Sequence, residues 1–523
     1  MNYPYPSQRN VVYGYRGMVA TGNVLAAQAG LEMLKKGGNA IDAALATSLC
    51  LSVTECCSNG LGGDLFAIIY YKNQYFGINS HGPAPRLLSL EALKEKGFDH
   101  LPKSGPESVT VPGLIGGVAA LQERFSKLSW EEIAAPAMAY ATHGFALQPR
   151  MALMMNRAKE RFEKDLPQAP TLSTWFSAFL QDRDCFKEGD LLKLPGHARA
   201  LEELAKTKGK SFYHGTIADE IDAFMRKNGG FLRKEDLKVF KPQWVSPLYT
   251  DYKGHRVFEL PPSGQGIGVL MALKILEKTG YSLHNSIEAT KLSLSYMQRH
   301  LADEGAMVHP LSAFLEDFPE KAAGIIGQRA LVPEETELFG DNTVYLCAAD
   351  GEGNMISLIQ SNYMGFGSGV VLPHWGIALQ NRGCNFSNDP TSANSLAPGK
   401  RPYHTIIPGF IEKPGTFRGP FGVMGGFMQP QGQLQILMNM IEEGLNLQSA
   451  IDKPRWQWIK GRKLHLEEGF SKGELEELEK RGHEVEILQD PVSFGRAEII
   501  LRYESGLLEG ACEPRTDAAV AVW

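Results

Sequence analysis

The segment GDNTVYLCAADGEGNMISLIQSNYMGFGSG, residues 340–369, has the pattern of a β-hairpin that opens on a threonine. Two apolar runs flank the turn Asp-Gly-Glu-Gly at residues 350–353, which is a strong hairpin signal. Pairing the two residues that flank this turn places Thr343 opposite Gln360, with Ser361 one diagonal step away. A register shifted by one residue would place Ser361 directly opposite Thr343. In either register, two hydroxyl groups meet at the open end of the hairpin.

A threonine at this position becomes a nucleophile with its own base if the chain is cut in front of it. A hydroxyl attacks well only when a base takes its proton, and no G-x-S-x-G elbow is present to supply one. The freed α-amine of Thr343 would have a pKa near 8, which suits a general base. Thr343 could make the cut itself, by attacking the carbonyl of Asn342 and shifting the acyl group from nitrogen to oxygen. The competing interpretation is an ordinary structural strand threonine.

The composition limits the class of protein. The chain has 523 residues, 43% of them apolar, and a formal net charge of −6, with lysine and arginine spread along it. This balance argues against nucleic acid as a partner. The odd number of cysteines, seven, favours a reduced compartment over a disulfide framework, and the first residues lack a signal-peptide pattern. The longest nearly apolar run, Ile41–Val53, is too short to span a bilayer. We therefore expect a cytoplasmic protein with no membrane partner.

The periodicity of apolar residues predicts blocks of helices and strands. Two helices are indicated within residues 23–53, divided at a Gly-Gly pair, and two strands follow around a Lys-Asn turn. Residues 116–300 are mostly helical in pattern, whereas strands dominate after Thr343. Strands bracketed by helices within one long unit are typical of a layered α+β fold.

Several motifs occur in an order that resembles the γ-glutamyltransferase family of N-terminal-nucleophile hydrolases. They are GMVATGNVLAAQAGLEMLKKGGNAIDAALA (17–46), SNGLGGDLFAI (58–68), ELPPSGQG (259–266), NTVYLCAADGEGNMISLIQS (342–361) and VMGGFMQPQG (423–432). The resemblance runs nearly end to end. It implies an α+β fold, a four-layer αββα sandwich of the N-terminal-nucleophile hydrolase type, and a precursor that cuts itself. Residues 1–342 would be the large-subunit segment and residues 343–523 the small-subunit segment, associated as one unit.

The resemblance also implies the catalytic residues. It places the nucleophile at Thr343, the hydroxyl partner of that nucleophile at Ser361, and the self-cleavage between Asn342 and Thr343. Gly425 and Gly426 match a glycine pair whose backbone N–H groups form the oxyanion hole in the family, where bare amide donors face the developing negative charge. Taken alone, a Gly-Gly pair is usually a turn.

The substrate-binding positions depart from the family pattern. His81 stands where the family has an arginine for the α-carboxylate of a γ-glutamyl group, and Asn385 stands where it has an aspartate for the α-amine. His404 and Thr405 replace a pair of serines, and Arg382 replaces a glutamine. A histidine is at most partly charged at neutral pH and asparagine is uncharged, so γ-glutamyl selectivity should be weakened. The Arg382 guanidinium could bind, through two hydrogen bonds, a substrate carboxylate at a position other than the α-carboxylate site of the family, unless Arg382 is already occupied in an ion pair.

The sequence therefore predicts a self-processing amidase of the glutathione hydrolase and γ-glutamyl transfer type. It would form an acyl-enzyme on Thr343 and release the acyl group to water or an amine. The alternatives are a cephalosporin- or glutaryl-acylase-like enzyme, a small-amide amidohydrolase, and, more remotely, a catalytically silent scaffold. The expected partners are a small-molecule amide and the two cleaved fragments, with a homodimer left open. We expect no cofactor, and no histidine has metal-ligand spacing.

Overall fold

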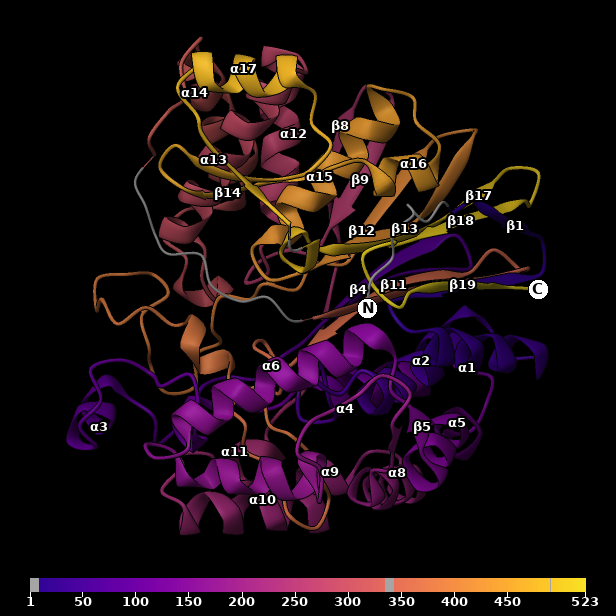
Figure 1. The fold of residues 1–523 in the computed structure, drawn as a ribbon, viewed down its shortest axis with the longest axis vertical. Helices are drawn as coiled ribbons and strands as arrows, with labels where there is room; N and C mark the ends of the chain where they lie inside the picture. The colour runs from indigo at the N-terminus through magenta and orange to yellow at the C-terminus, as the bar shows by residue number, and fades with distance from the viewer. Residues whose placement is uncertain (1–8, 334–342, 490) are drawn as a thin grey trace.

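The computed structural model describes residues 9–333, 343–489 and 491–523. Two seven-stranded sheets, antiparallel throughout, lie face to face between layers of helices (Figure 1). The first sheet, sheet I, has the order β19 (Ala519–Val522), β2 (Gly17–Thr21), β10 (Val344–Asp350), β11 (Met355–Ser361), β3 (Asp64–Tyr71), β4 (Gln74–Ser80), β7 (Gln243–Val245). The second, sheet II, has the order β1 (Val12–Gly14), β18 (Leu508–Cys512), β17 (Arg496–Tyr503), β13 (Phe417–Met424), β12 (Gly409–Lys413), β9 (His255–Glu259), β8 (Leu248–Tyr252). The α+β sandwich is thus confirmed.

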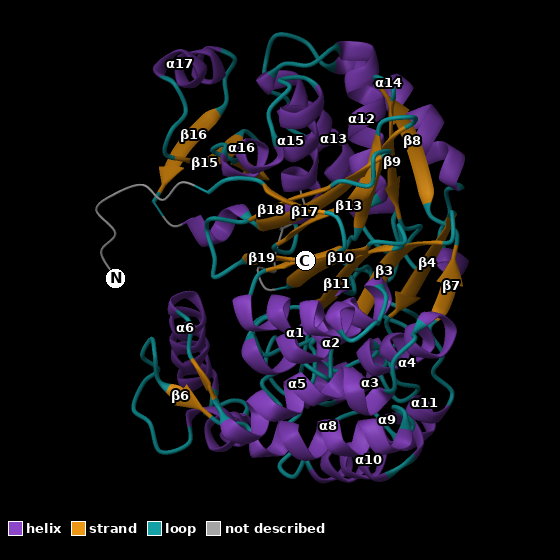
Figure 2. Ribbon diagram, turned by 90° about the vertical axis from the view of Figure 1, so that its right-hand side faces the viewer, coloured by secondary structure: helices purple, strands orange, loops and turns teal. Residues whose placement is uncertain are grey.

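Helices cover the outer face of each sheet, as Figure 2 shows. Those on the side of sheet I are α1 (Val24–Lys35), α2 (Ala40–Thr54), α3 (Leu90–Glu95), α4 (Leu114–Phe125), α5 (Trp130–His143), α6 (Pro149–Asp165), α7 (Ser173–Trp175), α8 (Pro195–Thr207), α9 (Ser211–His214), α10 (Thr216–Lys227) and α11 (Lys234–Lys238). Those on the side of sheet II are α12 (Ile267–Thr279), α13 (Leu283–His300), α14 (Phe318–Ile325), α15 (Met428–Ile441), α16 (Leu447–Asp452) and α17 (Lys472–Lys480). Two small sheets complete the fold, β5 (Phe145–Ala146) with β6 (Leu191–Leu192), and β14 (Trp456–Lys460) with β15 (Lys463–Glu467) and β16 (Glu484–Leu488).

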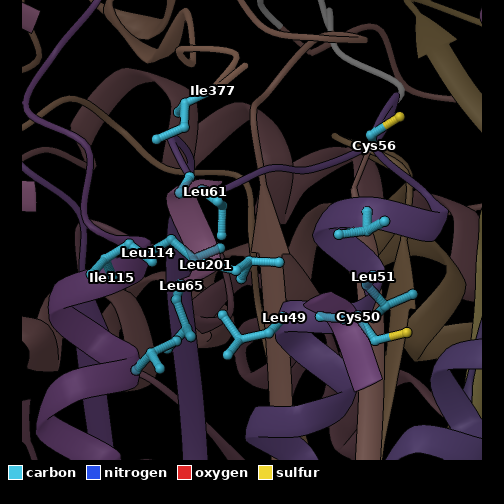
Figure 3. Close-up of a cluster of buried hydrophobic side chains, with 14 of the residues drawn as sticks. Leu49, Cys50, Leu51, Cys56, Leu61, Leu65, Leu114, Ile115, Leu201 and Ile377 are labelled. Atoms are coloured by element: carbon cyan, nitrogen blue, oxygen red, sulfur yellow. The ribbon is translucent and has the colours of Figure 1, made fainter. Parts of the chain in front are cut away.

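Helix α2 is the core element beneath sheet I. All of its 15 residues are buried, and Asn39 caps its N-terminus by accepting hydrogen bonds from the backbone N–H groups of Ile41 and Asp42. Leu49 of α2 belongs to one buried apolar cluster with Leu65 of β3 and Leu114 of α4 (Figure 3). Burying a leucine side chain contributes about 1.5–3 kcal/mol, so this apolar cluster is a major stabilising element of the fold.

The hairpin of β10 and β11 lies in the middle of sheet I, between β2 and β3. Its register differs by one residue from the first expectation, because Asp350 faces Asn354 and only three residues form the loop. The Asp350 carboxylate accepts hydrogen bonds from the Asn354 backbone and from the N–H of Ala40, which keeps Asp350 in the strand. Gly353 takes the left-handed conformation, with φ of +91°, that three-residue hairpin loops require. Extending this register brings Ser361 opposite Thr343.

Both large sheets combine strands from before and after Thr343. In sheet I, β2, β3, β4 and β7 precede it and β10, β11 and β19 follow it. A third apolar core lies between the two sheets, and it also draws side chains from both parts of the chain. Two fragments divided at Thr343 would therefore share one core. In the described ranges, no helix is both long and apolar enough to cross a membrane.

Candidate active site

Thr343 and Ser361 meet at the open end of the central hairpin. The Thr343 Oγ1 donates to the Ser361 Oγ over 3.3 Å, and the Ser361 Oγ also accepts a 2.8 Å hydrogen bond from the backbone N–H of Tyr363. Both side chains are buried. The hairpin geometry thus brings together the two hydroxyls that the sequence pairs. Asn342, the residue expected on the other side of the cut, lies outside the described residues.

The glycine pair forms a turn between β13 and α15. Gly425 and Gly426 have φ of +125° and +56°, which only glycine adopts without strain. The carbonyl of Gly425 accepts from Met428 N, and α15 begins at that residue. In the first turn of α15, the Gln429 Nε2 lies 3.5 Å from the Thr343 Oγ1. The first turn of α15, which follows the glycine turn, therefore contacts Thr343. The assignment of the Gly425 and Gly426 amides to an oxyanion hole stays a prediction.

A buried polar network adjoins the hairpin on the β3 side. Asp64, the first residue of β3, pairs with Ser361 in the sheet. One Asp64 oxygen lies 3.1 Å from the His404 Nε2 and 3.6 Å from the Arg382 Nε. The Arg382 Nη1 donates to the Thr405 Oγ1 over 2.9 Å, and its guanidinium lies over the Tyr363 ring. Arg382 is thus occupied in an ion pair, the alternative recognised for it from sequence, although its Nη2 has no hydrogen-bond partner among the described residues.

Burial dominates the protonation of this network. Desolvation raises the pKa of Asp64 to about 7, although the Arg382 guanidinium opposes the shift. Desolvation likewise lowers the pKa of Arg382 to about 10, against the attraction of Asp64. It also lowers the pKa of His404 well below its usual value. The network therefore contains one cation, Arg382, and one partly neutralised carboxyl at neutral pH.

His81 differs from the expectation of a partly charged imidazole. It follows β4, and its Nε2 is 2.9 Å from the Ser263 Oγ, with its ring against Phe66 and His404. Burial lowers the pKa of His81 well below its usual value, and the charges of Arg401 and Arg382 add to the shift. His81 is therefore neutral at pH 7 and cannot supply the positive charge that an arginine gives the family.

A cavity of about 760 Å³ adjoins the site. Its lining includes Tyr363 and Asn385, together with Phe427, which directly follows the glycine pair. The Asn385 Nδ2 donates to the carbonyl of Tyr403, another lining residue. Among the substrate-binding candidates, Asn385 lines the cavity. Arg382 does not line it, but its guanidinium lies over the ring of Tyr363, which does. In the described chain, His81, His404 and Thr405 do not line it.

A second buried cluster, distinct from the site, was missed from sequence. His284, Glu288 and His483 place their ligand-type atoms within 4.8 Å of one another, which a metal site requires. His284 and Glu288 are one helical turn apart on α13, a spacing that could have signalled them. The Lys291 ammonium lies 2.8 Å from the Glu288 Oε1, with both side chains fully buried. A cation therefore already neutralises the single carboxylate of this cluster.

Asp64 and Gln265 were also missed from sequence. Asp64 stands inside the motif SNGLGGDLFAI, and Gln265 inside ELPPSGQG. A carboxylate at the entry of a wholly apolar strand was the available signal for Asp64. Gln265 carries no such signal, because its importance comes from contacts with residues more than a hundred positions away.

We expect Ser361→Ala to slow the enzyme without unfolding it. The change removes the hydroxyl that accepts hydrogen bonds from the Thr343 Oγ1 and from the Tyr363 N–H. A hydrogen bond worth about 1–3 kcal/mol in the transition state lowers turnover about 5- to 150-fold when it is lost. The measurement is kcat of fully matured protein, with Ser361→Thr as the variant that keeps a hydroxyl. Unchanged kcat in Ser361→Ala would remove Ser361 from the mechanism.

The chain is similar to known proteins over nearly its whole length. A family model described as Gamma-glutamyltranspeptidase matches residues 26–523. The chain is 34% identical to a "Glutathione hydrolase-like YwrD proenzyme" of Bacillus subtilis, over 97% of this chain and 98% of that one. It is 32% identical to an "Oxamate amidohydrolase proenzyme" of Klebsiella pneumoniae, with the same coverage.

A solved structure is also similar over the whole chain. The cephalosporin acylase from Bacillus halodurans is 46% identical, with a TM-score of 0.95, and the match covers 100% of this chain and 98% of that one. Relatives with acylase and amidohydrolase names confirm the branch indicated by the sequence. The chain belongs to the gamma-glutamyltranspeptidase family and is an amide hydrolase of the N-terminal-nucleophile type.

Proposed function

We propose that the chain cuts itself before Thr343 and then hydrolyses an amide through an ester on that residue. The observation that carries the proposal is the Thr343 Oγ1 hydrogen-bonded to Ser361 beside the glycine turn. In the first step, the Thr343 oxygen attacks the Asn342 carbonyl carbon, the C–N bond breaks, and the nitrogen takes a proton. Water then hydrolyses the ester, which releases the first fragment as a carboxylate and restores the hydroxyl. The relatives named as proenzymes support such processing.

The matured Thr343 would use its α-amine as the base. The amine takes the hydroxyl proton as the oxygen attacks the substrate carbonyl, and it returns that proton to the leaving amine. Backbone N–H groups at Gly425 and Gly426 would stabilise the oxyanion of the tetrahedral intermediate. Water then attacks the acyl-enzyme in the same manner. An acceptor amine in place of water would give transfer instead of hydrolysis.

The acyl group that fits best carries a carboxylate and lacks an α-ammonium. Asn385 is neutral where the family has an aspartate, and Asp64 already accepts from Gly113 N and faces Arg382 and His404. At the Asn385 position an incoming ammonium would lose hydration without gaining the charged partner that an aspartate gives, which is costly. A carboxylate would instead meet the field of Arg382. An acylase-type specificity therefore suits the site better than a γ-glutamyl one.

The size of the cavity favours an acylase over a small-amide amidohydrolase. A volume of about 760 Å³ is in the range of pockets that hold drug-sized ligands. A small amide such as oxamate would leave most of it empty. The γ-glutamyl alternative remains the second candidate, because a glutathione hydrolase-like protein is 34% identical over nearly the full chain.

We predict that a glutaryl anilide is hydrolysed at least as well as the matched γ-glutamyl anilide. The pair differs only by the α-ammonium, so the ratio of kcat/KM isolates the recognition of that group. Asn385→Asp should move the preference toward the γ-glutamyl substrate by about tenfold, the difference between a neutral and a charge-assisted hydrogen bond. This single change is cleaner than adding His81→Arg, because His81 is fully enclosed.

Asp389→Asn is the matched control, since Asp389 also lines the cavity. It should leave the ratio unchanged. A wild type that prefers the γ-glutamyl anilide by about a hundredfold, or about 2.7 kcal/mol, would contradict the acylase assignment. If Asp389→Asn then abolished that preference, Asp389 would be the residue that recognises the amine.

A further inference from the structure

One buried glutamine connects three parts of the candidate site. Gln265 lies just before α12 and its side chain is fully buried. Its Nε2 donates to the carbonyl of Gly426 over 2.9 Å and to the carbonyl of Thr405 over 2.7 Å. Its Oε1 accepts from the Tyr403 hydroxyl over 2.8 Å. Each polar atom of the side chain therefore has a partner.

The backbone of Gln265 is fixed as well. Its N–H donates to the carbonyl of His404 over 3.0 Å, and the His404 N–H donates to the carbonyl of Ser263 over 2.9 Å. Gly264 and His404 also form an isolated parallel bridge. This pairing fixes the position of the Gln265 backbone relative to His404, and from that position the Gln265 side chain reaches the glycine turn.

The partners of Gln265 have different tasks in the proposed mechanism. Gly426 belongs to the turn whose amides would face the oxyanion. Thr405 accepts a hydrogen bond from Arg382, and Tyr403 is part of the cavity wall. Tyr403 is also stacked against Phe427, which follows Gly426 and lines the same cavity. The cavity wall is thus joined to the glycine turn through the Gln265 side chain, in addition to the stacking of Tyr403 on Phe427.

We propose that Gln265 is a positioning residue that sets the orientation of the Gly425-Gly426 turn and couples it to the cavity wall. The inference rests on the proposed function, in which these amides stabilise the oxyanion. The Gly426 carbonyl accepts from the Gln265 side chain over 2.9 Å and from the Gln429 N–H over 3.2 Å, and the shorter bond from Gln265 helps to orient the peptide plane on the C-terminal side of the turn. Donors of an oxyanion hole must be oriented before the reaction, and a displacement of about 1 Å can cost about a hundredfold in rate. Gln265 therefore acts on kcat rather than on ground-state binding.

Gln265→Glu tests the proposal with almost no change of shape. A carboxylate keeps an acceptor for Tyr403 but cannot donate to the two carbonyls. We expect kcat to fall at least about tenfold while KM stays within about threefold. Activity is to be normalised to the amount of Thr343 found as an N-terminus, so that slow maturation is not counted as slow turnover.

Gln435→Glu is the matched control. Gln435 lies on α15, is buried, donates to the carbonyls of Gln431 and Trp456, and accepts from the Trp456 N–H. Its replacement should lower the melting temperature to a similar degree and leave kcat within about twofold. Equal losses of kcat in both variants would overturn the proposal, and so would a folded Gln265→Glu with wild-type kcat.

Tyr403→Phe tests the coupling separately, because it leaves both donors of Gln265 in place. We expect a smaller loss of kcat, confined to amides large enough to fill the cavity. An equal loss for small and large amides would contradict the coupling. Failure of the proposed function can be distinguished from failure of the Gln265 proposal. In that case the wild-type protein would carry no N-terminal Thr343 and would form no acyl-enzyme.

Discussion

Thr343→Ala should remain a single chain of 57.5 kDa with no amidase activity. The variant loses the oxygen that attacks the preceding carbonyl, so neither self-cleavage nor acyl-enzyme formation can occur. Its fold should persist, because alanine fits where the Thr343 side chain is enclosed and the strand pairing of β10 uses backbone groups only. The loss of activity should be complete within detection. Denaturing electrophoresis and intact mass measure the cleavage, and an anilide assay measures the activity.

Thr343→Ser is the control for this result. Serine keeps the hydroxyl and the α-amine, so this variant should still mature and turn over, at a lower rate. Two fragments of the expected masses in Thr343→Ala would place the nucleophile elsewhere. A Thr343→Ala chain that stays whole but hydrolyses the substrate would separate maturation from catalysis and refute the shared nucleophile.

Replacing the Gly425 or Gly426 amide with an ester should lower kcat by about 10²–10³-fold at the position that donates to the oxyanion. An ester deletes the N–H and keeps the shape of the backbone. Gly426→Pro is a poorer test, because proline fixes φ near −65° whereas Gly426 has +56°. Glycolic acid introduced at either position by nonsense suppression avoids that distortion. The measurement is kcat of the matured protein.

An ester at Gly415 is the matched control. Gly415 is also a positive-φ glycine, with φ of +72°, but it lies in the exposed turn between β12 and β13. It should leave kcat unchanged. If all three esters behave alike, the glycine turn contributes no oxyanion donor and the hole must be sought on other elements around Thr343.

Local signals in the sequence explain why much of the fold could be predicted. The Gly-Gly break and the Asn39 cap between α1 and α2, and the Lys72-Asn73 turn between β3 and β4, depend on neighbouring residues alone. The hairpin register could not be predicted in this way. Asp350 is held in the strand by a local bond from the Asn354 N–H and by a bond from the Ala40 N–H, and the second of these joins residues 310 positions apart.

In the candidate site, too, contacts between residues close in sequence could be predicted and contacts between distant residues could not. The pairing of Thr343 with Ser361 follows from hairpin geometry, so it could be expected before the structure. The ion pair of Arg382 with Asp64 and the neutral state of His81 depend on burial among residues from distant elements. Residue type alone left open whether the Arg382 guanidinium is free or ion-paired, and it suggested a partly charged imidazole for His81. Burial in the folded protein determines the ion pairing of Arg382 and the neutral state of His81, and a local sequence pattern does not show which residues will be buried together.

N-terminal sequencing combined with intact mass of the purified wild-type protein shows whether the chain is cut before Thr343. Self-cleavage at this bond predicts two fragments that remain associated through the shared sheets, the second of them beginning Thr343-Val-Tyr-Leu-Cys. A single chain of 57.5 kDa that is nevertheless active, or a second fragment that begins at another residue, would contradict it.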